Sequence, residues 1–302
     1  MTPTTNRLHG LDFLRALMMS LGVVLHTSQQ YVTMPFHDYY WDVARSPSMD
    51  ALLIFINTFR MPVFFLLSGF FTALLFYKKG LKVMLGNRYQ RIVIPFVLFL
   101  PVLALIMSAL RIVSLHVMGT GELGFDMSFP GVDEERWFKT HNLWFLYYLI
   151  LHLVAVWVIV NLWRFLPAGI VKYVKSVTFG GTVYSGVFFI VVCLGLAAIG
   201  SLSDVGRISA KLSFIPDVKV FSYFGLCFLL GWVIYLRLDD LNDLARRWKK
   251  HMLMATILFA VSLVAFTLQG EAGSAYYVYK HALLSLVTGF SVGYYMLAFV
   301  GM

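Results

Sequence analysis

The sequence has few charged residues for its length. Of its 302 residues, 13% are charged and 60% are hydrophobic, whereas soluble globular domains carry about 25% charged residues. The mean hydropathy is +0.78. This composition excludes an ordinary soluble domain and predicts an integral membrane protein.

Cysteine is also scarce. Cys193 and Cys227 are the only two, and both lie within apolar segments. They indicate neither a disulfide framework nor a thiolate metal site, so we expect no metal and no redox chemistry. The net charge of +9 comes from basic residues between hydrophobic segments, without a compact basic domain or an RNA-binding motif. We therefore expect no nucleic acid partner.

Eight apolar segments are long enough to cross a bilayer, which takes roughly 20 helical residues. The first has no small-residue cleavage site, so we expect it to stay in the mature chain as a helix. No internal repeat stands out. We predict an all-α polytopic helical bundle of about eight transmembrane helices, forming a single membrane-embedded domain over residues 1–302. The predicted spans are 11–32, 49–77, 92–115, 143–162, 178–199, 220–238, 252–268 and 282–302.

Basic residues are unequally divided between alternate flanks of these spans. Fourteen Lys and Arg residues fall on the side of the amino terminus, and seven fall on the other side. By the positive-inside rule, the amino terminus is cytoplasmic and the first helix runs outward. The long polar stretch at 116–140 is then external, either as a binding or lid loop or as a solvated connector.

The first span carries ionisable residues along one face. Arg15 and His26 are eleven residues apart, which is about three helical turns and about 16 Å of rise. Gly22 lies between them on this face, and Asp12 lies one turn before Arg15. Such groups are costly in hydrocarbon and normally face a bundle interior or a cavity. Asp12, Arg15 and His26 are therefore our candidate catalytic residues.

The second span contains Arg60, Pro62, Ser68 and Gly69. Proline can kink a helix, and small residues permit close helix approach. Arg60 either lines a cavity, as a candidate acceptor-binding residue, or snorkels to the outer interface. Ser68 is grouped with the donor-binding candidates, although packing is the favoured interpretation of Ser68 and Gly69.

Arg88 and Arg91 are spaced i and i+3 where the third helix is expected to start. A helix N-terminus attracts anions, and paired guanidinium groups bind phosphate. The pair therefore predicts a phosphorylated cytosolic ligand. Lipid-anchoring arginines are the alternative, and spacing alone favours them.

His141, Asn142 and Trp144 stand at the outer start of the fourth span, followed by His152. His141 and Asn142 are candidates for binding a sugar hydroxyl, and Trp144 is a candidate for stacking on a sugar face. Alternatively, Trp144 belongs to the interfacial aromatic belt. We expect His152 to be a packed core residue.

Taken in order, these segments resemble the membrane-bound acyltransferase-3 family, and within it the glucan biosynthesis protein C branch of OpgC-like glucan succinyltransferases. The ordered set spans roughly the first half of the chain, although no single piece is specific. The segments are Gly10-Leu-Asp12-Phe-Leu-Arg15-Ala16 through His26, Phe59-Arg60-Met-Pro-Val-Phe-Phe-Leu-Leu-Ser68-Gly69-Phe70, Arg88-x-x-Arg91-Ile-Val-Ile-Pro95 and His141-Asn-Leu-Trp144-Phe145.

The resemblance implies transfer of an acyl group, such as succinyl or acetyl, from cytoplasmic acyl-CoA to a hydroxyl of an extracytoplasmic glucan or other carbohydrate. It implies an inner-membrane enzyme in which His26 is catalytic, Arg15 is its partner arginine, and Arg88 and Arg91 bind the acyl-CoA donor. Histidine suits general base catalysis because its unperturbed pKa lies near neutral pH. Family members usually have about ten helices, so we expect the final helices to be missing here.

Two other classes of protein remain open. A polar face through a helical bundle also fits a membrane transporter or flippase, although no inverted repeats or matching broken helices are evident. An inactive scaffold in a glucan-synthesis complex is the third possibility. The oligomeric state, the acyl group and the acceptor are not determined by the sequence.

Overall fold

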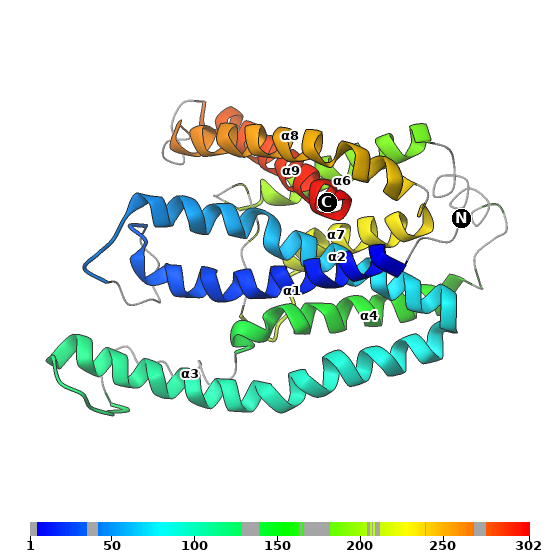
Figure 1. The fold of residues 1–302 in the computed structure, drawn as a ribbon. Coiled ribbons are helices and arrows are strands. Elements are labelled where there is room, and N and C mark those ends of the chain that lie inside the picture. Colours follow the sequence, from blue (N-terminus) through cyan, green and yellow to red (C-terminus); the bar gives the residue numbers. More distant parts are fainter. Residues whose placement is uncertain are drawn as a thin grey trace. The chain divides into compact units, whose positions relative to one another are not determined.

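The computed structural model describes residues 5–34, 42–128, 139–163, 182–203, 212–238, 240–268 and 276–302, with 165, 169, 206 and 208; only the backbone is described for 5–8, 182–185 and 240. These residues are almost entirely α-helical and include no strand (Figure 1). The predicted all-α fold class is therefore confirmed.

Eight α-helices lie in the described ranges, and each predicted span overlaps one of them. They are α1 (Thr5–Ser28), α2 (Pro47–Arg88), α3 (Ile94–Thr120), α4 (Trp144–Trp163), α6 (Thr182–Gly200), α7 (Val218–Leu236), α8 (Asp240–Leu268) and α9 (Tyr277–Gly301).

Six apolar helical ranges are long enough to cross a membrane, and one of them, Pro47–Thr120, contains both α2 and α3. A shorter apolar segment, Gly186–Gly200, lies in α6. Repeated apolar helices of this length make the chain a multi-pass membrane protein.

The chain divides into two compact units. Unit 1 comprises 1–78, 162–208 and 222–302, and unit 2 comprises 79–161 and 209–221. Each unit is described by itself below. The prediction of a single acyltransferase domain over residues 1–302 stays a prediction.

Helix α2 is longer than the predicted span of 49–77, because it continues to Arg88. Its one residue with non-helical dihedral angles is Gly80, at φ 79° and ψ 169°. Glycine has no Cβ and adopts positive φ without a steric penalty. The backbone therefore departs from helical geometry at Gly80 and not at Pro62.

Within unit 1, glycines allow helices to approach at backbone distance. A Cβ built at Gly69 of α2 would overlap the carbonyl oxygen of Phe228 in α7, and one at Gly231 of α7 would overlap the carbonyl oxygen of Leu66 in α2. Helix α9 packs against α8 and α6. Small residues at such contacts are typical of membrane helix bundles, where packing replaces the hydrophobic effect. The predicted packing role of Gly69 is confirmed.

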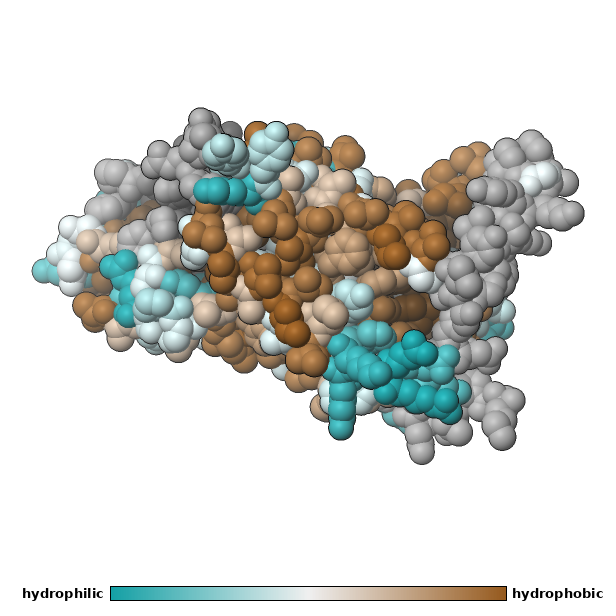
Figure 2. Space-filling model, turned by 90° about the horizontal axis from the view of Figure 1, so that it is seen from above, coloured by the Kyte–Doolittle hydropathy of each residue, from teal (hydrophilic) through white to brown (hydrophobic). Residues whose placement is uncertain are grey.

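Large apolar side chains remain exposed on several helices. In α3, Val97, Leu98 and Leu105 are each about 60% exposed, and Leu253 in α8 is 63% exposed. Figure 2 shows a continuous hydrophobic area on one face, with hydrophilic residues gathered outside it. A soluble protein rarely exposes such a patch, whereas lipid covers it in a bilayer.

Candidate functional site

Helices α1 and α2 lie side by side and antiparallel in unit 1 (Figure 1). Three contacts define their register: Arg15 lies over the ring of Phe71, Gly22 meets Arg60, and Thr33 bonds Asp50. Moving from Arg15 toward His26 along α1 therefore means moving toward the start of α2. This register turns the predicted polar face of α1 toward α2 at Arg15 and at Gly22.

His26 lies in the last turn of α1, and its imidazole has a polar partner. Its Nδ1 is 3.1 Å from Oε1 of Gln29, the first residue of the 3₁₀-helix η1 (Gln29–Tyr31). Gln29 is 8% exposed, whereas His26 is exposed. A buried amide thus holds one ring nitrogen while the imidazole stays accessible.

Arg60 of α2 is the buried cation of this region. The residue is only 8% exposed, and its Nε is buried without a hydrogen-bond partner among the described residues. Its Nη1 lies against Gly22, where a Cβ on the glycine would overlap it. Arg60 is also close enough to act electrostatically on His26. The burial argues against the snorkelling alternative, and the acceptor-binding role of Arg60 stays a prediction.

Asp12 and Arg15 form an ion pair one helical turn apart. Arg15 Nη2 is 3.4 Å from Asp12 Oδ1, with side chains 39% and 53% exposed. The guanidinium carbon of Arg15 lies 5.5 Å from the centroid of the Phe71 ring. The ion pair and the ring contact therefore orient Arg15 toward α2, although both side chains of the pair remain partly exposed.

Ser68 lies on α2 in a closely packed part of unit 1. It is 8% exposed, and its carbonyl accepts a 2.6 Å hydrogen bond from the hydroxyl of Thr72. The next residue is Gly69, at the close approach to α7. These surroundings fit the packing interpretation of Ser68 better than donor binding.

Two polar residues of this region were missed by the sequence analysis. Gln29 is three residues after His26, a spacing that places side chains together on a helix and offered a usable signal. Asp50 accepts hydrogen bonds from the backbone N–H groups of Thr33 and Met34 and from the Thr33 hydroxyl. Asp50 thereby ties the segment after α1 to the start of α2, and no local pattern announced this long-range contact.

Arg88 and Arg91 belong to unit 2, and their environments differ. Arg88 ends α2 and is 7% exposed, whereas Arg91 lies in the π-helix η2 (Tyr89–Val93) and is exposed. Residues Arg88, Val93 and Ile94 all have right-handed helical dihedral angles. The expected free N-terminus of the third helix was therefore wrong, because the helical backbone runs on from α2 into α3. A π-turn also holds more residues than an α-turn, so the i and i+3 spacing does not bring the two side chains onto one face as it would in an α-helix.

His141, Asn142 and Trp144 surround the start of α4 in unit 2. His141 and Asn142 lie in the 3₁₀-helix η4 (His141–Leu143), where His141 has an unusual φ of 43°. Asn142 is exposed, whereas Trp144 is 9% exposed with its ring 6.2 Å from that of Tyr148. Asn142 is thus accessible to a ligand, while Trp144 is mostly enclosed by protein.

His152 is packed, as the sequence predicts. Its Nδ1 is 2.6 Å from the carbonyl oxygen of Tyr148, its Nε2 is 3.0 Å from that of Phe221, and its ring stacks on the Phe221 ring. Both ring nitrogens are occupied. His152 therefore joins α4 to Phe221.

Metal ligands do not gather in the described ranges, where no cluster of three His, Cys, Asp or Glu residues occurs. The cysteines are free thiols, and both are buried.

Comparison with known proteins agrees with this architecture. The sequence model of the acyltransferase domain family, Acyl_transf_3, matches residues 8–301. The glucans biosynthesis protein C of Escherichia coli O1:K1 / APEC is 32% identical over 157 residues, and so are those of strains E24377A and HS. Each match covers 49% of this chain and 38% of the relative. No solved structure matches the chain.

The family match extends over nearly the whole chain, beyond the half that aligns with those relatives. It includes α1 with its polar face, the α1–α2 contact at Arg60, and the helices of both units. The chain therefore belongs to the acyltransferase-3 family.

Proposed function

We propose that this protein moves an acyl group from cytoplasmic acyl-CoA to a hydroxyl of an extracytoplasmic carbohydrate, with His26 as the general base. One observation carries the proposal: an accessible imidazole, oriented by Gln29, lies beside the buried cation of Arg60. The name of the relatives, glucans biosynthesis protein C, supports a glucan as the acceptor.

The contact with Gln29 supports Nε2 of His26 as the nitrogen that acts as the base. An amide oxygen only accepts hydrogen bonds, so Nδ1 must donate its proton to Oε1 of Gln29. The neutral imidazole then carries its lone pair on Nε2. Because His26 is exposed, Nε2 is available to a substrate hydroxyl. Gln29 is a positioning residue in this proposal, since it fixes the tautomer.

Arg60 suits the negative charge that develops during acyl transfer. Attack of a hydroxyl on a thioester carbonyl places charge on the carbonyl oxygen, and a fixed cation in a dry site stabilises it. Arg60 was assigned to the acceptor side from the sequence, and its contact with Gly22, about one helical turn before His26, supports this assignment. Its buried Nε has no described partner that would have to be displaced.

The proposed step balances in protons and bonds. His26 Nε2 takes the proton of the acceptor hydroxyl as its oxygen bonds to the thioester carbonyl carbon. The carbon–sulfur bond then breaks, and the imidazolium gives its proton to the leaving thiolate of coenzyme A. The ion pair of Asp12 and Arg15 lies further inward on α1 and would face the donor along its path.

The remaining candidates are assigned to the two substrates. We assign the exposed Arg91 to the donor phosphates, with the buried Arg88 as a second donor candidate and Ser68 as a weaker one. The acceptor is assigned to Asn142 and His141, with Trp144 at its edge. The charge asymmetry of the loops supports a cytoplasmic amino terminus and an inner-membrane location.

Substitution of His26 tests the proposal directly. The full chain, purified in detergent, is given succinyl-CoA or acetyl-CoA and a glucan, and both thiol release and acylated glucan are measured. His26→Ala should lose at least about a hundredfold in rate, because removal of a general base costs about 10²–10⁴-fold. His9→Ala is the matched control, since His9 is an exposed histidine of the same helix outside the polar face. Full activity of a folded His26→Ala protein would contradict the assigned role.

A further inference from the structure

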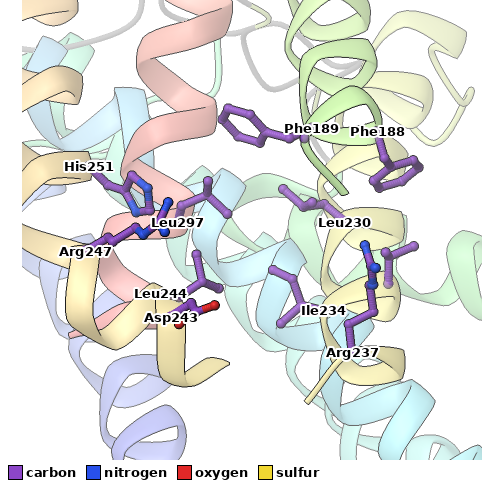
Figure 3. Close-up of a pocket in the computed structure, with 12 residues that line it drawn as sticks. Phe188, Phe189, Leu230, Ile234, Arg237, Asp243, Leu244, Arg247, His251 and Leu297 are labelled. Carbon is purple, nitrogen blue, oxygen red and sulfur yellow. The ribbon is translucent and has the colours of Figure 1, made fainter. Parts of the chain in front are cut away.

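Unit 1 contains a hollow that the proposed chemistry does not use. It has a volume of about 350 Å³, at the lower end of the roughly 300–1,000 Å³ of small-molecule sites. Four helices supply its wall: α6, α7, α8 and α9. Most of the lining is apolar, including Phe188, Phe189, Leu230, Ile234 and Leu297 (Figure 3).

Basic groups stand on two sides of this hollow. Figure 3 shows Arg247 and His251 together on one side, and Arg237 on the other with its guanidinium directed toward Phe188. Among the described lining residues, Asp243 is acidic and Arg237 and Arg247 are basic, so these residues carry a net positive charge. Arg247 forms no ion pair with any described residue.

His251 adds a polar atom without a partner. Its Nδ1 is buried and has no hydrogen-bond partner within the described chain. Arg247 acts on it electrostatically, so the two groups are close. An unpaired buried polar atom is costly unless a ligand or water satisfies it. The hollow thus offers apolar walls, two cations and an unsatisfied ring nitrogen in one place.

The position of the hollow along α8 matches the level of lipid headgroups. The first turns of α8 are polar and include Arg246, Lys249 and Lys250, and Lys249 lies 5.7 Å from the ring of Trp248. From Met252 the helix is apolar, with large side chains exposed. A basic segment with an interfacial tryptophan is typical of the membrane boundary. The hollow lies at this transition and beside the end of α7 at Leu236.

We propose that this hollow is a binding site for an anionic phospholipid. The phosphate would lie between Arg237 and Arg247, with His251 as a further hydrogen-bonding group, and an acyl chain would follow Phe188, Leu230 and Ile234. The net positive charge favours an anionic headgroup over a zwitterionic one. Apolar walls continuous with exposed apolar helix surface favour a lipid over a soluble phosphate compound.

Competition between two lipids tests this site in the detergent-purified full chain. Retention of phosphatidylglycerol and of phosphatidylcholine is measured by native mass spectrometry for the wild type and for Arg237→Gln/Arg247→Gln. Each guanidinium near the surface is worth about fivefold in affinity for anionic lipid, so the double variant should lose roughly 30-fold for phosphatidylglycerol. Its affinity for phosphatidylcholine should hardly change.

Two further variants separate the hollow from general surface charge. Arg246→Gln removes a neighbouring exposed arginine that does not line the hollow, and it should keep the preference for phosphatidylglycerol. Gly186→Leu leaves the charge unchanged. A Cβ at Gly186 meets nothing within 4 Å, and the rest of the leucine side chain should take up space at the hollow. It should lower the retention of both lipids.

Three results would overturn the proposal. One is equal retention of the two lipids by the wild type. Another is an effect of Arg246→Gln as large as that of the double variant. The third is displacement of phosphatidylglycerol by coenzyme A with the same dependence on Arg237 and Arg247, which would make the hollow a nucleotide site.

Discussion

Replacement of Gly22 by alanine should damage the site while sparing the fold. A Cβ at Gly22 would lie less than 3.0 Å from Nη1 of Arg60, and real Cβ atoms essentially never make contacts that short. Ordinary contact needs 3.4 Å or more, so the guanidinium must move by roughly 1 Å. Nη1 is the far end of a flexible side chain, and it can yield without movement of either helix backbone.

The magnitude follows from this displacement. Misplacement of a reacting or stabilising group by about 1 Å costs up to about a hundredfold in rate, or about 2.7 kcal/mol. Alanine is favoured over glycine in a helix interior by about 1 kcal/mol, so the melting temperature should hold or rise. We therefore expect Gly22→Ala to lower kcat/KM by up to about a hundredfold in a fully folded protein.

The assay is acyl-CoA thiol release in detergent, with thermal unfolding of the same samples. Gly10→Ala is the control, because a Cβ at Gly10 of the same helix meets nothing within 4 Å. In an Arg60→Lys background, Gly22→Ala should lower kcat/KM far less, since lysine has no Nη1 to displace. Equal losses in both backgrounds, or wild-type activity of Gly22→Ala, would refute the reasoning.

Three other substitutions have expected outcomes. Gln29→Leu removes the acceptor for Nδ1 of His26 and should lower kcat by about tenfold or more with little change in KM for the donor; an unchanged kcat would contradict the tautomer assignment. Arg91→Glu should raise KM for acyl-CoA, more so at low salt, whereas a KM independent of this charge would favour lipid anchoring. Gly69→Leu should prevent folding, because the new side chain would overlap the backbone of Phe228, and size-exclusion chromatography should then show aggregation. A monodisperse, active protein would show that α2 and α7 can separate there.

The parts of the fold and site that follow a single helical period could be predicted from the sequence. The eight apolar segments and the shared face of Asp12, Arg15 and Gly22 are of this kind, since a spacing of 3.6 residues determines which side chains align. The same argument could have predicted the contact between Gln29 and His26, which are three residues apart. It lies in a 3₁₀-turn just after α1, where the regular period ends.

Other features depend on contacts between distant segments. Whether Arg60 snorkels or is buried is decided by Gly22 on another helix, which leaves room for the guanidinium. Arg88 and Arg91 have an i and i+3 spacing in the sequence, but the π-helix between them changes the period, and nothing in Arg88-Tyr-Gln-Arg91 announces it. Trp144 was predicted either to stack on a sugar or to belong to the interfacial belt, and its burial comes from the packing at the start of α4.

The π-helix η2 determines which side chains of α3 are covered by protein. Downstream of it, Phe96, Ala104, Ser108 and Ile112 are buried, and they recur at multiples of four along one side of the helix. Deleting one residue within Tyr89–Val93 would restore an unbroken α-helix and rotate everything after it by about 100°. Ser108 would then turn away from its buried position and apolar neighbours would take its place. Five residues before α3 thus determine which of its side chains meet lipid over its whole length.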